Sequence, residues 1–158
     1  MKQKPLSEKQ LLILWFVQLR WYAIVFMFLI VIESIFISRL QLPLVPCLAI
    51  IGSAALYNLV FPFLAKNLPA FAENNFFTYF RSSLDILVIT LLLHFTGGIE
   101  SPFGFFYIIE FAAIATYNFE VIAYILSFQA AIFYWISCIL EAHLIIPHYR
   151  AVSTPGTL

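Results

Sequence analysis

The residues best suited to chemistry gather in one short stretch, LLLHFTGGIESPFGFFYIIE, between Leu91 and Glu110. His94 can donate and accept hydrogen bonds near neutral pH, which suits a hydroxylated headgroup or a quinone. Glu110 lies deep in an apolar segment, so it either pairs with His94, stays protonated or contacts a ligand. Glu33 is expected to approach the same level. The predicted ligand-binding residues are His94, Thr96, Gly97, Gly98, Glu100, Ser101, Pro102, Phe103 and Glu110.

The same stretch would also make a good turn with nothing bound to it. Gly97 and Gly98 can adopt backbone angles closed to other residues, which permits a tight turn and the close approach of a ligand to bare amides. Pro102 suits the first turn of a helix, and Ser101 suits its N-cap. The aromatic run that follows is either a membrane-interface belt or a surface for a flat lipid-soluble ligand: Phe103, Phe105, Phe106 and Tyr107.

A second polar group is predicted inside the apolar segments. Arg20, Asn58 and Asp85 fall at a similar depth in three different segments. An ionisable side chain at membrane depth costs a few kcal/mol or more, so it is expected to be paired, to face the bundle interior or to be functional. We therefore expect an intramembrane polar layer in the cytosolic half of the bundle, with Arg81, one turn before Asp85, as a competing partner. The layer either fixes helix packing or carries a signal.

The amino-acid composition indicates which kind of structure holds these residues in place. Of the 158 residues, 63% are hydrophobic and 10% are charged, whereas a soluble domain carries about a quarter charged residues. A helix needs about 20 apolar residues to cross a bilayer, and successive segments approach that length. The sequence predicts one all-α integral membrane domain over residues 1–158, a polytopic helical bundle with five spans at about 11–37, 44–65, 76–95, 103–117 and 120–140.

Lysines and arginines in short loops predict the orientation of these spans. With a cytosolic N-terminus, the inside holds Lys2, Lys4, Lys9, Lys66 and Arg81, against Arg39 and Arg150 outside. The turn at Gly97 and Gly98 then faces the outside of the membrane. The weakly polar tail is expected to be a chain cut short, with a sixth helix beyond Leu158.

Several function classes find no support in the sequence. The formal net charge is zero, so no basic excess indicates nucleic acid as a partner. Cys47 and Cys138 have no CxxC or Cys/His metal spacing, and we interpret them as small packing residues. Motifs such as HExxH, paired aspartates or a nucleophilic serine are missing, so the sequence predicts no catalytic residue and no metal ligand.

The stretch TGGIESPF, from Thr96 to Phe103, resembles the GGxxNPF signature of the membrane domain of RegB-type redox-sensing histidine kinases. It is also similar to the GGIESPF form in other bacterial sensor kinases, and LRW at Leu19 to Trp21 fits as well. The resemblance implies six helices, a cytosolic N-terminus and a periplasmic motif loop that binds ubiquinone. Ser101 replaces the family's asparagine, which removes an amide that both donates and accepts. The matching motif positions are Gly97, Gly98, Ser101, Pro102 and Phe103.

The resemblance further implies a multi-pass protein of the bacterial inner membrane that acts as a homodimer, with a cytosolic kinase region and a response regulator as partners. We hypothesise a membrane input domain of a two-component histidine kinase that reads a lipid-soluble or envelope signal, with ubiquinone or menaquinone as candidate cofactor. No phosphoacceptor-histidine box or ATP-binding box occurs in the chain, so the kinase region would lie outside it. The alternatives are a small transporter-like protein, a structural membrane subunit, or haem bound by His94 with His143 or His148.

Overall fold

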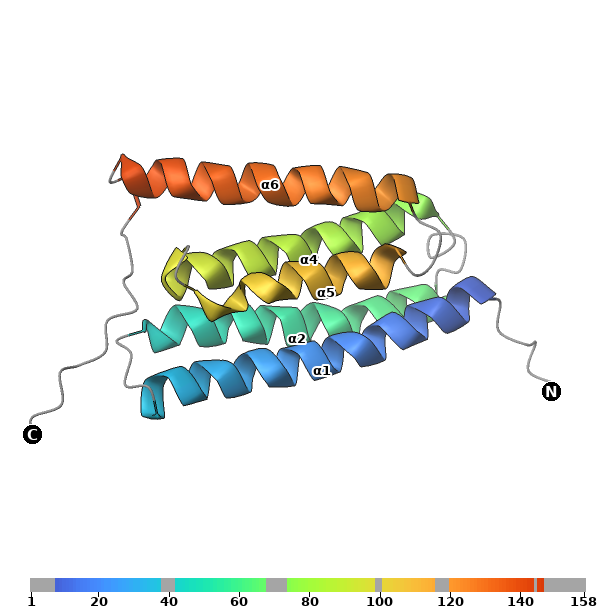
Figure 1. Cartoon of the computed structure of the whole chain (residues 1–158). Coiled ribbons are helices and arrows are strands. Elements are labelled where there is room, and N and C mark those ends of the chain that lie inside the picture. The colour runs from blue at the N-terminus through green and yellow to red at the C-terminus, as the bar shows by residue number, and fades with distance from the viewer. Residues whose placement is uncertain are drawn as a thin grey trace, which may run out of the picture.

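Apolar helices make up the part of the chain that the structure describes. In this computed structural model, the described residues are 8–37, 42–67, 74–98, 101–115, 120–143 and 145–146. They contain no strand, which confirms the all-α prediction. The elements are α1 (Glu8–Phe36), α2 (Leu44–Asn67), α4 (Asn75–Phe95), the short 3-10 helix η2 (Pro102–Gly104), α5 (Phe105–Ala115) and α6 (Glu120–Ala142) (Figure 1).

Four of these helices are long and apolar enough to cross a bilayer: α1, α2, α4 and α6. Helix α5 has 11 residues, so it extends only about 16 Å at 1.5 Å per residue, against a hydrocarbon core of about 30 Å. Each predicted apolar segment therefore forms a helix, but the fourth is shorter than its predicted range. Residues 116 and 117 of that range lie outside the described residues.

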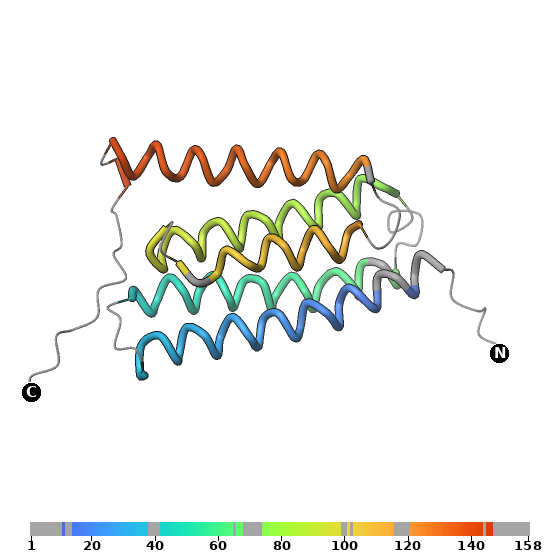
Figure 2. Tube along the Cα trace, in the orientation of Figure 1, coloured from blue at the N-terminus to red at the C-terminus, as the bar shows by residue number. Residues whose placement is uncertain are grey.

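Helix α4 lies at the centre of the bundle. It packs against α2 on one side and against α5 and α6 on the other, while α1 packs on α2 (Figure 1). The trace in Figure 2 shows that consecutive helices run in opposite directions. The ends of α1, α4 and α6 and the starts of α2 and α5 therefore share one end of the bundle, which we call the turn end.

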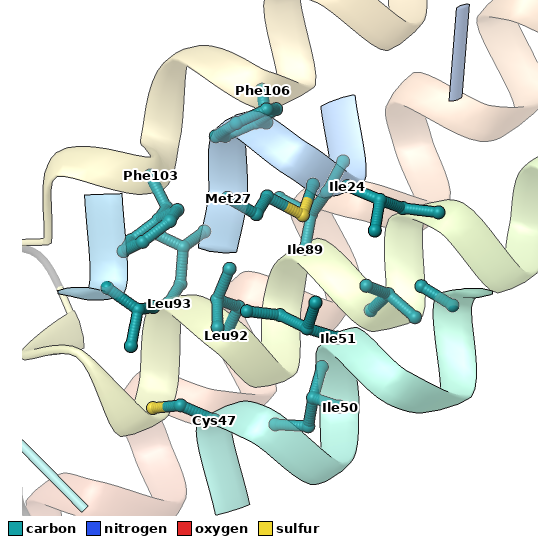
Figure 3. Packing of buried hydrophobic residues seen from close by; sticks show 13 residues of the cluster. Ile24, Met27, Cys47, Ile50, Ile51, Ile89, Leu92, Leu93, Phe103 and Phe106 are labelled. Carbon is teal, nitrogen blue, oxygen red and sulfur yellow. The ribbon is translucent and has the colours of Figure 1, made fainter. Parts of the chain in front are cut away.

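The largest apolar core joins α1, α2, α4 and the η2–α5 segment near the turn end (Figure 3). Phe103 is 0% exposed and stacks on Phe106, with ring centroids 5.9 Å apart. Both rings lie within this buried cluster, together with Met27, Leu92 and Leu93. Because helices in lipid gain little from escaping water, this close packing is the main apolar force between them. The two rings are therefore core residues, and an outward-facing interface belt cannot include them.

Hydrogen bonds between side chains hold α6 against α4. Gln129 of α6 accepts a hydrogen bond from the Tyr79 hydroxyl at 3.1 Å, and its amide donates to Ser83. Replacing Gln129 by leucine should lower the free energy of unfolding by about 1 kcal/mol, since interhelical hydrogen bonds contribute about that much in membranes. Reversible unfolding by sodium dodecyl sulfate, followed by circular dichroism, measures the change.

The control for this prediction is Ser127→Ala on the same helix. Ser127 is exposed, and its hydroxyl donates only to the Ala123 carbonyl of α6 at 2.8 Å. A loss in Ser127→Ala equal to that in Gln129→Leu would contradict the role assigned to Gln129.

Candidate functional site

Described residues of the turn between α4 and η2 are hydrogen-bonded to one another and to the end of α4. Thr96 ends α4, where its N–H donates to the Leu92 carbonyl at 3.0 Å. The hydroxyls of Thr96 and Ser101 are hydrogen-bonded to each other across the turn. Ser101 then accepts a hydrogen bond from the Phe103 N–H at 3.3 Å, which makes it the N-cap of η2. The predicted cap is therefore confirmed, although the element that it caps is a short 3-10 helix.

His94, at the end of α4, pairs with Glu141 near the end of α6. His94 Nδ1 lies 2.6 Å from Glu141 Oε1, and the two side chains are 9% and 12% exposed. The sequence prediction included His94 but missed Glu141, because the last predicted span ended at residue 140. Two consecutive reversals of direction after α4 would have indicated the contact, since they return the end of α6 to the level of His94.

The two glycines of the turn have positive φ angles, 114° at Gly97 and 58° at Gly98. A β-carbon on Gly98 would lie 3.2 Å from Glu141 Oε2. Glycine at this position therefore gives both the left-handed backbone and the space that the Glu141 carboxylate occupies beside His94. The turn thus serves as a docking place for α6.

Replacing Gly98 by alanine should lower the free energy of unfolding by about 1 to 2 kcal/mol, because a left-handed conformation costs that much for an L-residue. The new methyl group should also push Glu141 away from His94. Thermal unfolding in lipid nanodiscs gives the stability, and the His94 ring resonances report the contact between His94 and Glu141.

The matched control for this turn is Gly104→Ala. Gly104 has no positive φ, and apart from its immediate chain neighbours no atom lies within 4 Å of its β-carbon position. We expect a change within about 0.5 kcal/mol for this substitution. If Gly98→Ala and Gly104→Ala lost the same stability, the positive φ of Gly98 would not be the cause of the loss.

The intramembrane polar layer joins α1, α2 and α4. Arg20 is paired with Asp85 through Nη2, and its Nη1 donates to Asn58 Oδ1 at 3.3 Å. The Tyr57 hydroxyl donates to the other oxygen of Asp85. Asn58 in turn donates to the Val17 carbonyl at 3.2 Å. The structure thus brings together Arg20, Asn58 and Asp85, and it adds Tyr57, which sequence reasoning missed.

Two expectations about this layer need correction. Asp85 lies at the middle of α4 rather than in one half of it. Arg81 does not pair with Asp85: its guanidinium lies over the Phe16 ring, 4.6 Å from the ring centre. Arg20 and Tyr57 already occupy both oxygens of Asp85. A desolvated cation over an aromatic face gains about 2 kcal/mol, which offsets part of the cost of burying Arg81.

Glu110 lies with the polar layer and not with His94. It lines one cavity together with Arg20 and Asp85. The helix rise explains this placement: Glu110 lies about 13 Å from the turn along η2 and α5, close to the depth of about 15 Å for Asp85 along α4. His94 is only about one residue from the end of α4. The structure therefore separates the two residues that the sequence analysis grouped at the turn.

Of the remaining predicted residues, some lie in the described part of the chain and others lie outside it. Glu33 is exposed on α1, and His143 is exposed just after α6. The backbone of Pro102 begins η2. Glu100 and His148 lie outside the described residues. Within the described ranges, no three side chains among His, Cys, Asp and Glu gather as a metal site.

Comparison with known protein families gives one match. The PilS-like transmembrane domain, a family with six transmembrane helices, matches residues 3–118. The match includes α1, α2, α4 and α5 and the turn after α4, and it ends before α6. No curated protein and no solved structure matches the chain.

Proposed function

Because this chain belongs to the PilS-like transmembrane domain family, we propose that it is the membrane input domain of a bacterial sensor histidine kinase. The family match over residues 3–118 is the observation that carries this proposal, since PilS is itself a sensor histidine kinase. In this proposal the chain lies in the inner membrane as a homodimer, with its N-terminus in the cytosol. It controls a cytosolic kinase region that phosphorylates a response regulator.

The proposed signal is a lipid-soluble molecule that acts at the turn end, with ubiquinone or menaquinone as candidates. Phe103 is 0% exposed and the Glu141 carboxylate already lies beside Gly98, so a ligand cannot enter without displacing a packed group. The contact that a hydrogen-bonding ligand could replace in kind is the pair between His94 and Glu141. A quinone carbonyl can accept the hydrogen bond of a His94 N–H and so replace the Glu141 carboxylate.

Release of Glu141 would loosen the turn end of α6. Described polar ties between α4 and α6 are made by Gln129, in the middle of α6, and by Glu141 at the turn end. Loss of the second tie would let the end of α6 move while the middle stays anchored. A ligand can shift this equilibrium only by as much as its affinities for the two packings differ. The quinone and the quinol would differ, because a carbonyl accepts hydrogen bonds whereas a hydroxyl can also donate.

The test measures kinase activity of the full-length protein that carries this domain, in inverted membrane vesicles with radiolabelled ATP. Autophosphorylation should change with the ratio of ubiquinone to ubiquinol. In His94→Ala, the response should be lost or need at least tenfold more ligand. In Glu141→Gln, where the contact to be displaced is weaker, the response should need less ligand or be replaced by constant output, whereas Ser127→Ala should respond as the wild type does. A wild-type response in both His94→Ala and Glu141→Gln would exclude the His94–Glu141 pair as the sensor. No phosphorylated histidine under any condition would contradict the proposal as a whole.

A further inference from the structure

A cavity of about 40 Å³ lies beside the polar layer, between α1, α2, α4 and α5. Most of its wall is apolar, including Ile24, Met27, Val88 and Ile89. Four polar side chains also reach it: Arg20, Tyr57, Asp85 and Glu110. A largely apolar cavity with a few convergent polar groups is typical of a ligand site. The cavity is distinct from the turn, since neither His94 nor any residue from 96 to 103 lines it.

Glu110 is the lining residue with unused hydrogen-bonding capacity. Both oxygens of Asp85 accept hydrogen bonds, one from Arg20 and one from Tyr57. Arg20 is further bonded to Asn58. By contrast, Glu110 Oε1 is buried and makes no hydrogen bond of normal length in the described part of the chain. The Ser82 hydroxyl, which is also buried and unpaired, is a protein donor that interacts with the same carboxyl group. A buried polar atom without a partner costs about 1 to 3 kcal/mol, so this site favours a ligand that can donate to it.

Size and chemistry together define the group that fits. A water needs about 10 to 15 Å³ and two or more polar partners. The cavity has the volume, and its lining holds two possible acceptors, Glu110 Oε1 and the Tyr57 hydroxyl oxygen, which donates to Asp85 but can still accept. A ring does not fit, because an apolar cavity that binds benzene measures about 150 Å³. From these observations we propose that the cavity is a binding site for a single hydroxyl donor, held by Glu110. The donor is either a water molecule or the hydroxyl end of a linear lipid-soluble alcohol.

Two residues that line the cavity, Ile109 of α5 and Ala23 of α1, also reach the outer surface of the bundle, so we take the seam between α1 and α5 as the route of entry in this proposal. Ile109, next to Glu110, is 40% exposed, and Ala23 on α1 is partly exposed. Nearer the turn end the seam is closed, because the Phe26 ring packs on Phe105 and Phe106 at 5.9 and 6.0 Å. The proposal concerns this cavity alone and does not depend on a role in kinase control.

The test uses the purified chain in lipid nanodiscs with labelled isoleucine and valine methyl groups. Magnetisation transfer from water to Val88 and Ile89 should appear in the wild type, fall at least threefold in Glu110→Leu and persist in Glu110→Gln. Addition of 1-decanol shows whether an alcohol can take the place of water in the cavity. 1-Decanol should remove the magnetisation transfer from water and shift these methyl resonances, whereas n-decane at equal membrane concentration should do neither. A water contact that 1-decanol leaves unchanged would limit the site to water.

Two further outcomes decide the proposal. No water contact in the wild type, together with no shift from 1-decanol, would show that the cavity is dry and overturn it. A water contact that survives in Glu110→Leu would overturn the role of Glu110. Should Glu110→Leu fail to fold, Ala23→Leu fills the cavity from α1 and leaves every polar lining group in place. It should abolish the water contact while the Gly98 resonance, which reports the intact turn, remains unchanged.

Discussion

Replacing Asp85 by alanine should lower the free energy of unfolding by about 3 to 5 kcal/mol, because it removes the carboxylate that is paired with the buried guanidinium of Arg20. Arg20 is 8% exposed, and its remaining hydrogen bond is a 3.3 Å contact with the neutral amide of Asn58. Tyr57 loses its acceptor in the same variant. Reversible unfolding in bicelles by sodium dodecyl sulfate measures the loss.

The double variant Arg20→Met with Asp85→Leu distinguishes a buried charge from a general packing defect. Apolar replacement of a whole buried ion pair is often neutral or stabilising, so this variant should regain most of the stability lost in Asp85→Ala. Glu33→Gln is the matched acid control, because Glu33 is exposed on α1. A double variant as unstable as Asp85→Ala would mean that the layer is held by more than the Arg20–Asp85 pair.

The polar layer was predictable from two quantities. The free-energy cost of an unpaired ionisable group in lipid requires a partner, and the depth of each residue along its span indicates which residues can meet. Few ionisable side chains occur in the apolar segments, and each must find a partner there. Counting residues from the segment ends was sufficient to group Arg20, Asn58 and Asp85. It was not sufficient to choose between Arg20 and Arg81 as the partner of Asp85. That choice depends on rotation of the helices, which turns Arg81 onto the Phe16 ring.

The turn end was less predictable, for a different physical reason. The GG and SP pairs correctly indicated a reversal with Ser101 as a cap. Their spacing says nothing of the packing partner, and Glu141 comes from a helix 47 residues farther along the chain than His94. Glu110 was grouped with His94 from closeness in sequence, although the rise of α5 carries it to the depth of Asp85. Distances along the helix axes would have placed Glu110 correctly. They would not have identified Glu141 as the partner of His94.

Replacing Phe103 by alanine should lower the free energy of unfolding by about 3 kcal/mol. The side chain is 0% exposed and stacks on Phe106 within the core between α1, α2 and α4, so truncation leaves a cavity. This value is at the lower end of the stability losses known for Phe→Ala substitutions in protein cores. The reason is that moving a ring between lipid and the core changes the free energy little, so the cavity supplies most of the loss. Phe63→Ala, at a ring that is 69% exposed on α2, should change stability by less than about 0.5 kcal/mol.

This prediction also decides how the motif phenylalanine takes part in sensing. Phe103→Leu keeps an apolar side chain of similar size, so it should cost less than about 1.5 kcal/mol. A ligand that stacks on the ring would lose affinity in Phe103→Leu while the fold stays intact. If Phe103 acts only as a core residue, ubiquinone affinity should be unchanged in Phe103→Leu and should fall in Phe103→Ala only in step with unfolding. Loss of affinity in a fully folded Phe103→Leu would therefore show that the ring leaves the core to meet the ligand.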